Sequence, residues 1–149
     1  LKVRKALASD RERCMELLQN LASFTGGAMS SSAPKIFDQL LENERGEVFV
    51  AEDTGRILGM ASISYNLAMR YGGEYCQLEE LIVAPAGRGK NIGGQLVQET
   101  VKEAKSRGCS EYGLYLVEKT EQNLEFYEKY GFQKVGSELR QSLKSQIRD

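Results

Sequence analysis

The sequence predicts one α/β domain built on a mixed β-sheet with helices on both faces. Its 149 residues are enough to bury one sizeable core. Apolar residues alternate in some segments, as in half-buried strands, and recur at helical spacing in others. The second half of the chain reads strand, helix, strand, an order that pairs two strands in parallel, whereas the strands before it are joined by short turns and pair antiparallel. We therefore expect residues 1–149 to form a single domain with the order βααβββαβα and a terminal strand.

The first third of the chain predicts a strand followed by two helices. Residues 2–6 are the strand candidate, and Ser9 and Glu12 have the spacing of a capping box at a helix start. One face of this helix follows the i, i+3, i+4, i+7 pattern: Cys14, Leu17, Leu18 and Leu21. Residues 23–33 are rich in serine and glycine and form a loop, either an inert connection or a lid over a substrate. Pro34 then suits the first turn of the second helix.

The middle of the chain predicts a three-strand antiparallel meander. Residues 48–52 and 57–65 are strands, and the sequence Asp-Thr-Gly-Arg between them is a strong hairpin signal. A second turn over residues 66–73 leads into a third strand, residues 74–83. Three consecutive strands with such short connections are expected to pair with their neighbours in chain order.

The last third of the chain predicts the parallel unit and a final strand. A helical period continues from Ile92 to Gly108, and residues 112–116 alternate as a strand. Thr120 can cap a last helix, after which Gly131 turns the chain into the terminal strand.

Composition excludes several classes of function. Twenty basic and twenty-one acidic residues leave a net charge of -1, so we expect neither a nucleic-acid nor a membrane partner. The sequence contains no histidine, the commonest general base and metal ligand, and we expect no metal. Cys14, Cys76 and Cys109 are odd in number and scattered, which is typical of reduced thiols in a cytoplasmic protein. No segment has the roughly 18 apolar residues of a membrane span, and the first residues lack a signal-peptide core.

A glycine-rich turn after the third strand of the meander predicts an anion site. The apolar strand ends at Pro85, and small and basic residues then open a helix: Arg88, Gly89, Lys90, Asn91, Ile92, Gly93 and Gly94. Free N–H groups at a helix start, together with the helix dipole, favour a phosphate group. The glycine spacing matches neither a P-loop nor the Rossmann fingerprint.

This turn resembles the acyl-CoA binding turn of the GNAT family of N-acetyltransferases. The family pattern is Gln or Arg, two residues, Gly, one residue, then Gly or Ala, after a strand that ends in Val-x-Pro. Arg88 and Gly93 fill its outer positions, and Asn91 stands where the middle glycine is usual; Asn is the residue that best tolerates a positive φ after glycine. The resemblance is specific over residues 78–132, and in the first 69 residues it rests on the order of elements. It implies a GNAT-like fold with about six to seven strands, four helices on both faces and a homodimer through sheet edges.

The resemblance also implies roles for particular residues. In the family, the strand before the turn separates from its parallel neighbour and binds the pantetheine arm, which corresponds here to Leu81, Ile82 and Val83. The pyrophosphate would lie on residues 88–94. Tyr127 occupies the family's position for the general acid, and a phenol with a pKa of about 10 can protonate a leaving thiolate; the alternative, which we favour less, is a core tyrosine. Asn123 lies one turn earlier and either reaches the cofactor or is only a helix-face residue.

The general base is expected among two adjacent carboxylates. Glu79 and Glu80 point to opposite faces of the strand unless a bulge intervenes, so at most one faces the acceptor amine in a regular strand. We expect Glu80 to be the base, with Glu79 as second candidate.

Three functions remain open at the level of sequence. The leading one is an acetyl-CoA-dependent N-acetyltransferase that transfers acetyl directly to a primary amine of a small molecule or peptide. The alternative is a non-catalytic acyl-CoA-binding sensor or scaffold module. A nucleotide-binding switch is a third, which lacks the Lys-Ser/Thr pair after the turn.

Overall fold

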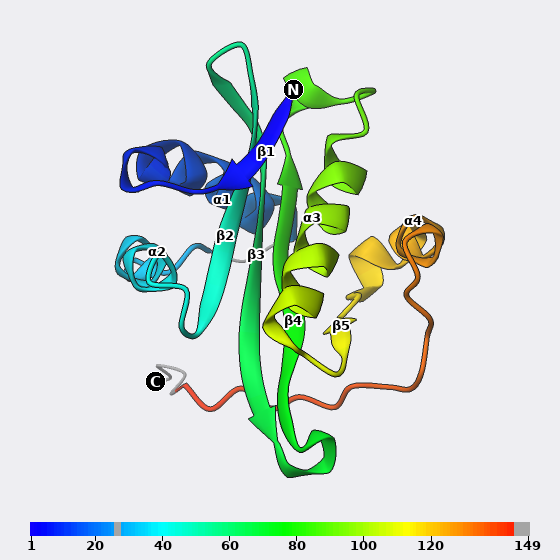
Figure 1. Ribbon diagram of the computed structural model, residues 1–149. Helices are drawn as coiled ribbons and strands as arrows, with labels where there is room; N and C mark the ends of the chain where they lie inside the picture. The colour runs from blue at the N-terminus through cyan, green and yellow to red at the C-terminus, as the bar shows by residue number, and fades with distance from the viewer. Residues whose placement is uncertain (26–27, 145–149) are drawn as a thin grey trace, which may run out of the picture.

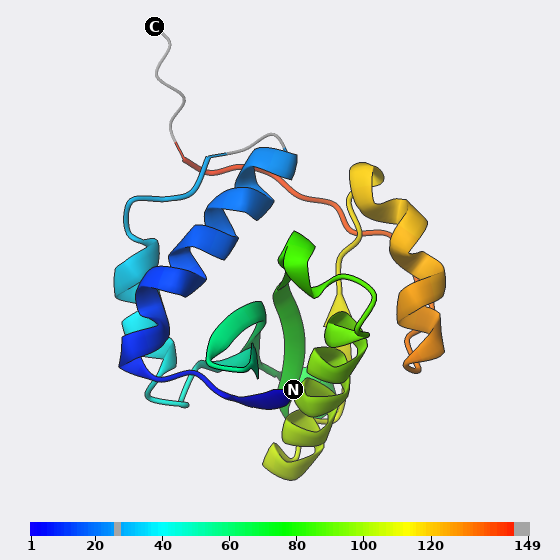
Figure 2. The same ribbon diagram turned by 90° about the horizontal axis from the view of Figure 1, so that it is seen from above.

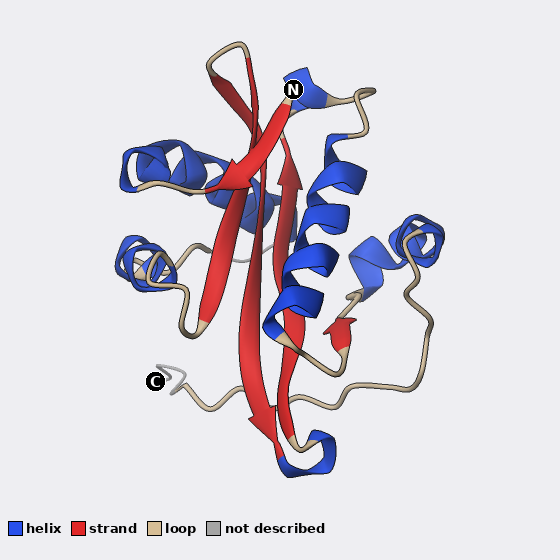
Figure 3. Cartoon of the chain, viewed as in Figure 1, coloured by secondary structure: helices blue, strands red, loops and turns tan. Residues whose placement is uncertain are grey.

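The computed structural model describes residues 1–25 and 28–144, and these form one mixed sheet with helices around it (Figures 1 and 3). The strands are β1 (Lys2–Lys5), β2 (Gly46–Asp53), β3 (Arg56–Ala68), β4 (Gly73–Val83) and β5 (Tyr112–Leu114). The helices are α1 (Arg11–Thr25), α2 (Ala33–Leu40), α3 (Ile92–Arg107) and α4 (Leu124–Lys129). Short 3-10 turns precede α1, connect β3 to β4, follow β4 and lead into α4: Ala8–Asp10, Met69–Tyr71, Pro85–Gly87 and Glu118–Asn123.

The sheet has the order β1-β2-β3-β4-β5, and its first three pairings are antiparallel while β4 and β5 run parallel. The predicted mixed sheet, with its meander and parallel unit, is therefore confirmed. The predicted hairpin between β2 and β3 also forms, with Asp53 paired to Arg56. Thr54 (φ 48°) and Gly55 (φ 80°) are both left-handed, as the twist-matching two-residue hairpin turn requires.

The helices cover both faces of the sheet, as predicted (Figure 2). α1 and α2 bury Cys14, Leu17 and Phe37 against one face. α3 buries Ile92, Leu96, Val97 and Ala104 against the other, where Tyr127 of α4 joins the same cluster. Within the ranges that the structure describes, no helix is both long and apolar enough to cross a bilayer.

The start of the first helix differs from the prediction. The chain enters α1 through the short turn Ala8–Asp10, where the Asp10 side chain accepts the Leu7 N–H at 2.7 Å. The pair Ser9 and Glu12 therefore does not form the expected capping box. Arg4 also binds Asp10 at 2.8 Å, and this hydrogen bond lowers the pKa of Asp10, so the aspartate caps the helix as a carboxylate.

The number of strands is also smaller than the six to seven predicted. Among the described residues the sheet has five strands, and β5 is shorter than residues 112–116. No ladder forms over residues 133–144, where Val135 and Leu139 are each 95% exposed. A strand needs a neighbour to accept its hydrogen bonds, and this segment has none within the described chain. The proposed lid, residues 23–33, includes residues 26–27, which lie outside the described ranges.

Candidate active site

The parallel strands β4 and β5 separate part-way along their length. Their pairing begins at Cys76 with Tyr112 and ends at Leu78 with Leu114. β4 continues for five more residues, Glu79–Val83, with β3 on one side and no strand on the other. In the described chain this stretch therefore has one open edge, which begins where the pairing of β4 with β5 ends.

The alternation of hydrogen bonds decides which peptide groups face this open edge. The N–H of Ala84 bonds to the carbonyl of Leu58 at 2.8 Å, and Val83 is opposite Gly59, so Val83 is in a non-hydrogen-bonded pair with β3. The same alternation applies to Leu81, which is opposite Ala61. Leu81 and Val83 thus turn their N–H and C=O groups toward the opening. Ile82 lies between them, directs its peptide groups to β3, and has a buried side chain.

The glycine-rich turn brings free N–H groups to the end of this opening. Asn91 adopts a left-handed conformation (φ 56°, ψ 35°), as expected for the residue at the usual middle glycine, and Gly89 is left-handed as well (φ 81°). The Asn91 side chain does not cap α3. The N–H groups of Ile92, Gly93 and Gly94 accordingly have no acceptor in the described part of the chain, so they can bind an anion.

The two cations of the turn have different surroundings. Lys90 Nζ lies 3.2 Å from Oδ2 of Asp53 at the end of β2, so part of the charge of Lys90 is neutralised. Arg88 is exposed and has no ion-pair partner among the described residues. Arg88 is therefore the cation that remains available to a bound phosphate.

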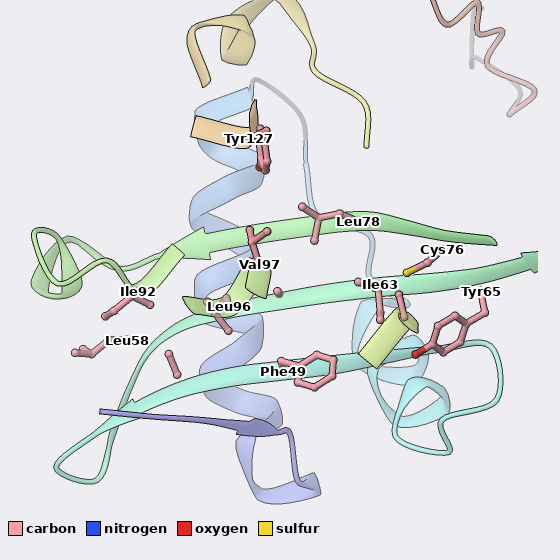
Figure 4. Close-up of a cluster of buried hydrophobic side chains, with 13 residues drawn as sticks. Phe49, Leu58, Ile63, Tyr65, Cys76, Leu78, Ile92, Leu96, Val97 and Tyr127 are labelled. Atoms are coloured by element: carbon pink, nitrogen blue, oxygen red, sulfur yellow. The ribbon is translucent and has the colours of Figure 1, made fainter. Parts of the chain in front are cut away.

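Tyr127 lies across the opening from β4, on α4. It is 9% exposed and occupies the end of the α3-side cluster away from Phe49 (Figure 4). Its ring makes edge-on contacts with Phe126 and Phe132, at centroid distances of 5.0 and 5.9 Å. Its hydroxyl has no hydrogen-bond partner among residues 1–25 and 28–144, and it is not one of the fully buried unpaired polar atoms, so the oxygen is accessible at the edge of the cluster. Burial raises the pKa of Tyr127, so the hydroxyl keeps its proton at neutral pH.

A β-bulge brings the two candidate bases to the same face of β4. Ser62 is opposite Glu80, but the next pair is Ile63 with Leu78, so Glu79 is the extra residue. Both serines of β3 that flank Ile63 bind a carboxylate: Ser62 Oγ donates to Glu80, and Ser64 Oγ donates to Glu79 at 2.6 Å. Since Ile63 belongs to the α3-side core, the serines and both carboxylates are on the face covered by α1 and α2.

Glu80 differs from Glu79 in burial. Glu79 is exposed, whereas Glu80 is half-buried. Desolvation raises the pKa of Glu80, the nearby charge of Glu79 raises it further, and the hydrogen bond from Ser62 opposes the shift. A raised carboxyl pKa brings a group closer to the working range of a general base.

Sequence reasoning missed the residues that hold the candidate site in place. Ser62 and Ser64 orient the carboxylates, and their i, i+2 spacing in a strand was the available signal. Tyr130 was also missed, and its hydroxyl donates to Asn91 Oδ1 at 3.2 Å. Asn123 is exposed at the start of α4, one turn before Tyr127.

Comparison with known proteins identifies the family. A model of the acetyltransferase (GNAT) family matches residues 12–132, most of the chain. The chain belongs to this family, which confirms the predicted membership, and the predicted fold class agrees with the structures that it resembles.

Individual relatives are more distant. A glucosamine 6-phosphate N-acetyltransferase of Trypanosoma brucei brucei is 32% identical over 98 residues, which cover 65% of each chain. A mouse thialysine N-epsilon-acetyltransferase is 25% identical over 89% of this chain and 84% of its own length. The solved structure of a transcriptional regulator from Bacillus halodurans has a TM-score of 0.84 at 25% identity, over 95% of this chain and 99% of that one.

Proposed function

We propose that this protein is an N-acetyltransferase that transfers acetyl from acetyl-CoA directly to a primary amine of a small molecule or peptide. The observation that carries the proposal is the open edge of β4, which ends at the uncapped first turn of α3. Two relatives are named for small amines, glucosamine 6-phosphate and thialysine, which favours a small-molecule acceptor.

The residues present fit acetyl-CoA along this path. The pantetheine arm carries amide groups, which match the free peptide groups of Leu81 and Val83, with Ile82 anchoring the strand between them. The diphosphate matches the first N–H groups of α3, with Arg88 as the available cation. Gly89 and Asn91 allow the close backbone turn, and Lys90 adds charge at its rim. We also propose that Asn123 contacts the cofactor.

The two sides of β4 suit the two halves of the reaction. Glu80 lies on the α1/α2 face and would accept a proton from the amine, with Glu79 binding or assisting beside it. Tyr127 lies on the α4 side and would give its proton to the leaving thiolate. With acid and base on opposite sides of one opening, both substrates can be held together, so no covalent enzyme intermediate is needed. Acetyl-CoA itself supplies the activated thioester carbonyl.

The test combines binding and turnover. We expect calorimetry to detect coenzyme A binding, and an amine panel to reveal thiol release from acetyl-CoA. Tyr127→Phe should lower turnover at least tenfold, about 1.4 kcal/mol of barrier, with little change in coenzyme A affinity. Binding without thiol release for any amine would favour the sensor or scaffold function, and absence of binding would refute both.

We further propose that the protein works as a homodimer in the cytoplasm. Support for self-association comes from exposed apolar residues at the far end of the β3–β4 hairpin, where Leu67 is 82% exposed, and in the tail, where Leu143 is 86% exposed. The three cysteines are free, as a reducing compartment would keep them. Light scattering after size-exclusion chromatography should give twice the chain mass, and a monomer at micromolar concentration would contradict the dimer.

A further inference from the structure

Tyr130, directly after α4, makes an unexpected contact with the glycine-rich turn of residues 88–94, which is the proposed cofactor turn. It lies one turn after Tyr127, and its hydroxyl donates to Asn91 Oδ1 at 3.2 Å. The same hydroxyl lies directly over Gly94, where a Cβ atom would collide with both the Tyr130 hydroxyl and Asn91 Oδ1. Gly94 thus provides the space that the Tyr130 hydroxyl occupies.

Phe126 packs against the neighbouring glycine of the same turn, Gly93. A Cβ atom at Gly93 would lie 3.4 Å from the Phe126 ring, and 3.7 Å from Val83. Phe126 also makes edge-on ring contacts with Tyr127 and Tyr130, at 5.0 and 5.2 Å. The two glycines of the first turn of α3 therefore contact two aromatic side chains, Phe126 in α4 and Tyr130 directly after it, with Tyr127 between them in the chain.

α4 depends on such contacts for its position. It spans six residues, too few to be stable alone, so tertiary contacts must fix its orientation. In the ranges described, the Tyr130–Asn91 hydrogen bond is the side-chain hydrogen bond that joins α4 to the turn at the start of α3. Asn91 can accept it because its side chain is not used to cap α3.

We propose that Tyr130 is a positioning residue: its hydrogen bond to Asn91 and its seat over Gly94 fix α4 against the cofactor turn and so hold the Tyr127 hydroxyl at the leaving sulfur. This inference rests on the proposed transferase function. Asn91, in the place of the usual glycine, thereby gains a role that glycine cannot supply, as the acceptor that couples the turn to the acid-bearing helix.

The experiment compares Tyr130→Phe, Asn91→Gly and the double variant with the wild-type chain, using thiol release from acetyl-CoA. Tyr130→Phe removes only the hydroxyl, and we expect kcat to fall three- to tenfold while KM for acetyl-CoA changes less than twofold. We expect kcat to change more than KM because Tyr127 acts as charge develops on the sulfur, not when the cofactor binds. Tyr71→Phe, which removes a phenol hydroxyl on the distant β3–β4 turn, should leave both constants unchanged.

The double variant tests the hydrogen bond itself. If the two side chains act through one contact, the double variant should lose no more kcat than the worse single variant. Losses that multiply, or a Tyr130→Phe variant with lower thermal stability and unchanged kcat, would overturn the proposal. A wild-type chain without thiol release would instead refute the transferase function, so the two failures are distinguishable.

Discussion

At the scale of residues, the paired carboxylates of β4 show how one irregularity creates different chemical environments. Without the bulge, Glu79 and Glu80 would lie on opposite faces of the strand. With it, each binds its own serine on β3, and the more buried Glu80 has the raised pKa. The like charge of Glu79 adds to this shift in the pKa of Glu80.

Glu80→Gln tests the assignment of the base through pH dependence. A base must be deprotonated to act, and because the pKa of Glu80 is raised, its carboxylate is lost at a higher pH than for an ordinary glutamate. In the wild-type chain, kcat/KM should therefore fall as pH drops through this raised pKa. At neutral pH, kcat/KM of the variant should be roughly a hundredfold lower than that of the wild-type chain. The fall of kcat/KM at low pH, the acid limb of the profile, should be absent from the variant.

Glu79→Gln provides the comparison for this experiment. It should retain the acid limb and shift it to lower pH, because removing the neighbouring charge favours the ionised form of Glu80. An acid limb that persists in Glu80→Gln and disappears in Glu79→Gln would reverse the assignment.

Sequence and structure agree at residues whose backbone chemistry is local. The positive φ values of Asn91 and Gly55 suit their residue types, and the sequence Asp-Thr-Gly-Arg located the hairpin turn, although the positive φ of the β-branched Thr54 runs against its own preference. The bulge at Glu79 and the contact of Tyr130 with Asn91 were not predictable, because both depend on what lies across a strand pair or on another helix. Local preferences therefore located the candidate site, and long-range packing determined which face each side chain occupies.

At the scale of elements, the glycine-rich turn of residues 88–94 is positioned by close packing of α3 on β3. A Cβ atom at Gly59 would lie 2.8 Å from Ile92 and 3.2 Å from Leu96, the two residues that anchor the first half of α3. It would also lie 3.1 Å from the Ile82 carbonyl. Gly59 thus sets how near the start of α3 approaches the open strand.

Gly59→Ala should lower the free energy of unfolding by about 1–3 kcal/mol, because the added methyl group overpacks a filled interface. Urea unfolding measures this change. Gly113→Ala on β5 is the matched control, since its Cβ meets no atom within 4 Å and alanine suits a strand at least as well. Equal effects of the two substitutions would show that close packing at Gly59 is not limiting.

The terminal strand illustrates where element prediction fails. A terminal strand was expected after Gly131, but a strand needs a partner edge, and none is paired to these residues in the described chain. Parallel pairing of β4 with β5, by contrast, was predictable because a helix of suitable length connects the two strands.

At the scale of the whole molecule, a buried polar network connects four elements on the α3 side. Glu47 of β2 is 1% exposed and accepts a hydrogen bond from the Tyr65 hydroxyl of β3. The Lys5 Nζ atom of β1 lies 2.8 Å from Glu47 Oε1 and 3.3 Å from Oε2 of Glu103 in α3. The hydrogen bond with Glu47 is the main cause that raises the pKa of Lys5, and burial is the main cause that raises that of Tyr65. The network therefore ties the first strand and α3 to the middle of the sheet.

Glu47→Gln should lower the free energy of unfolding by about 1–3 kcal/mol, because the buried Tyr65 hydroxyl loses a charged acceptor and the half-exposed Lys5 loses its closest counter-charge. Asp38→Asn, which breaks the exposed pair with Arg11, should change this free energy by less than about 0.5 kcal/mol.

The folded-state pKa values of Lys5 and Tyr65 are raised, so the stabilisation is complete below their unfolded values near pH 10 and is lost as pH rises further. Urea unfolding between pH 8 and 11 should therefore show a steeper alkaline loss for the wild-type chain than for Glu47→Gln, and parallel curves would show that this network does not carry the coupling.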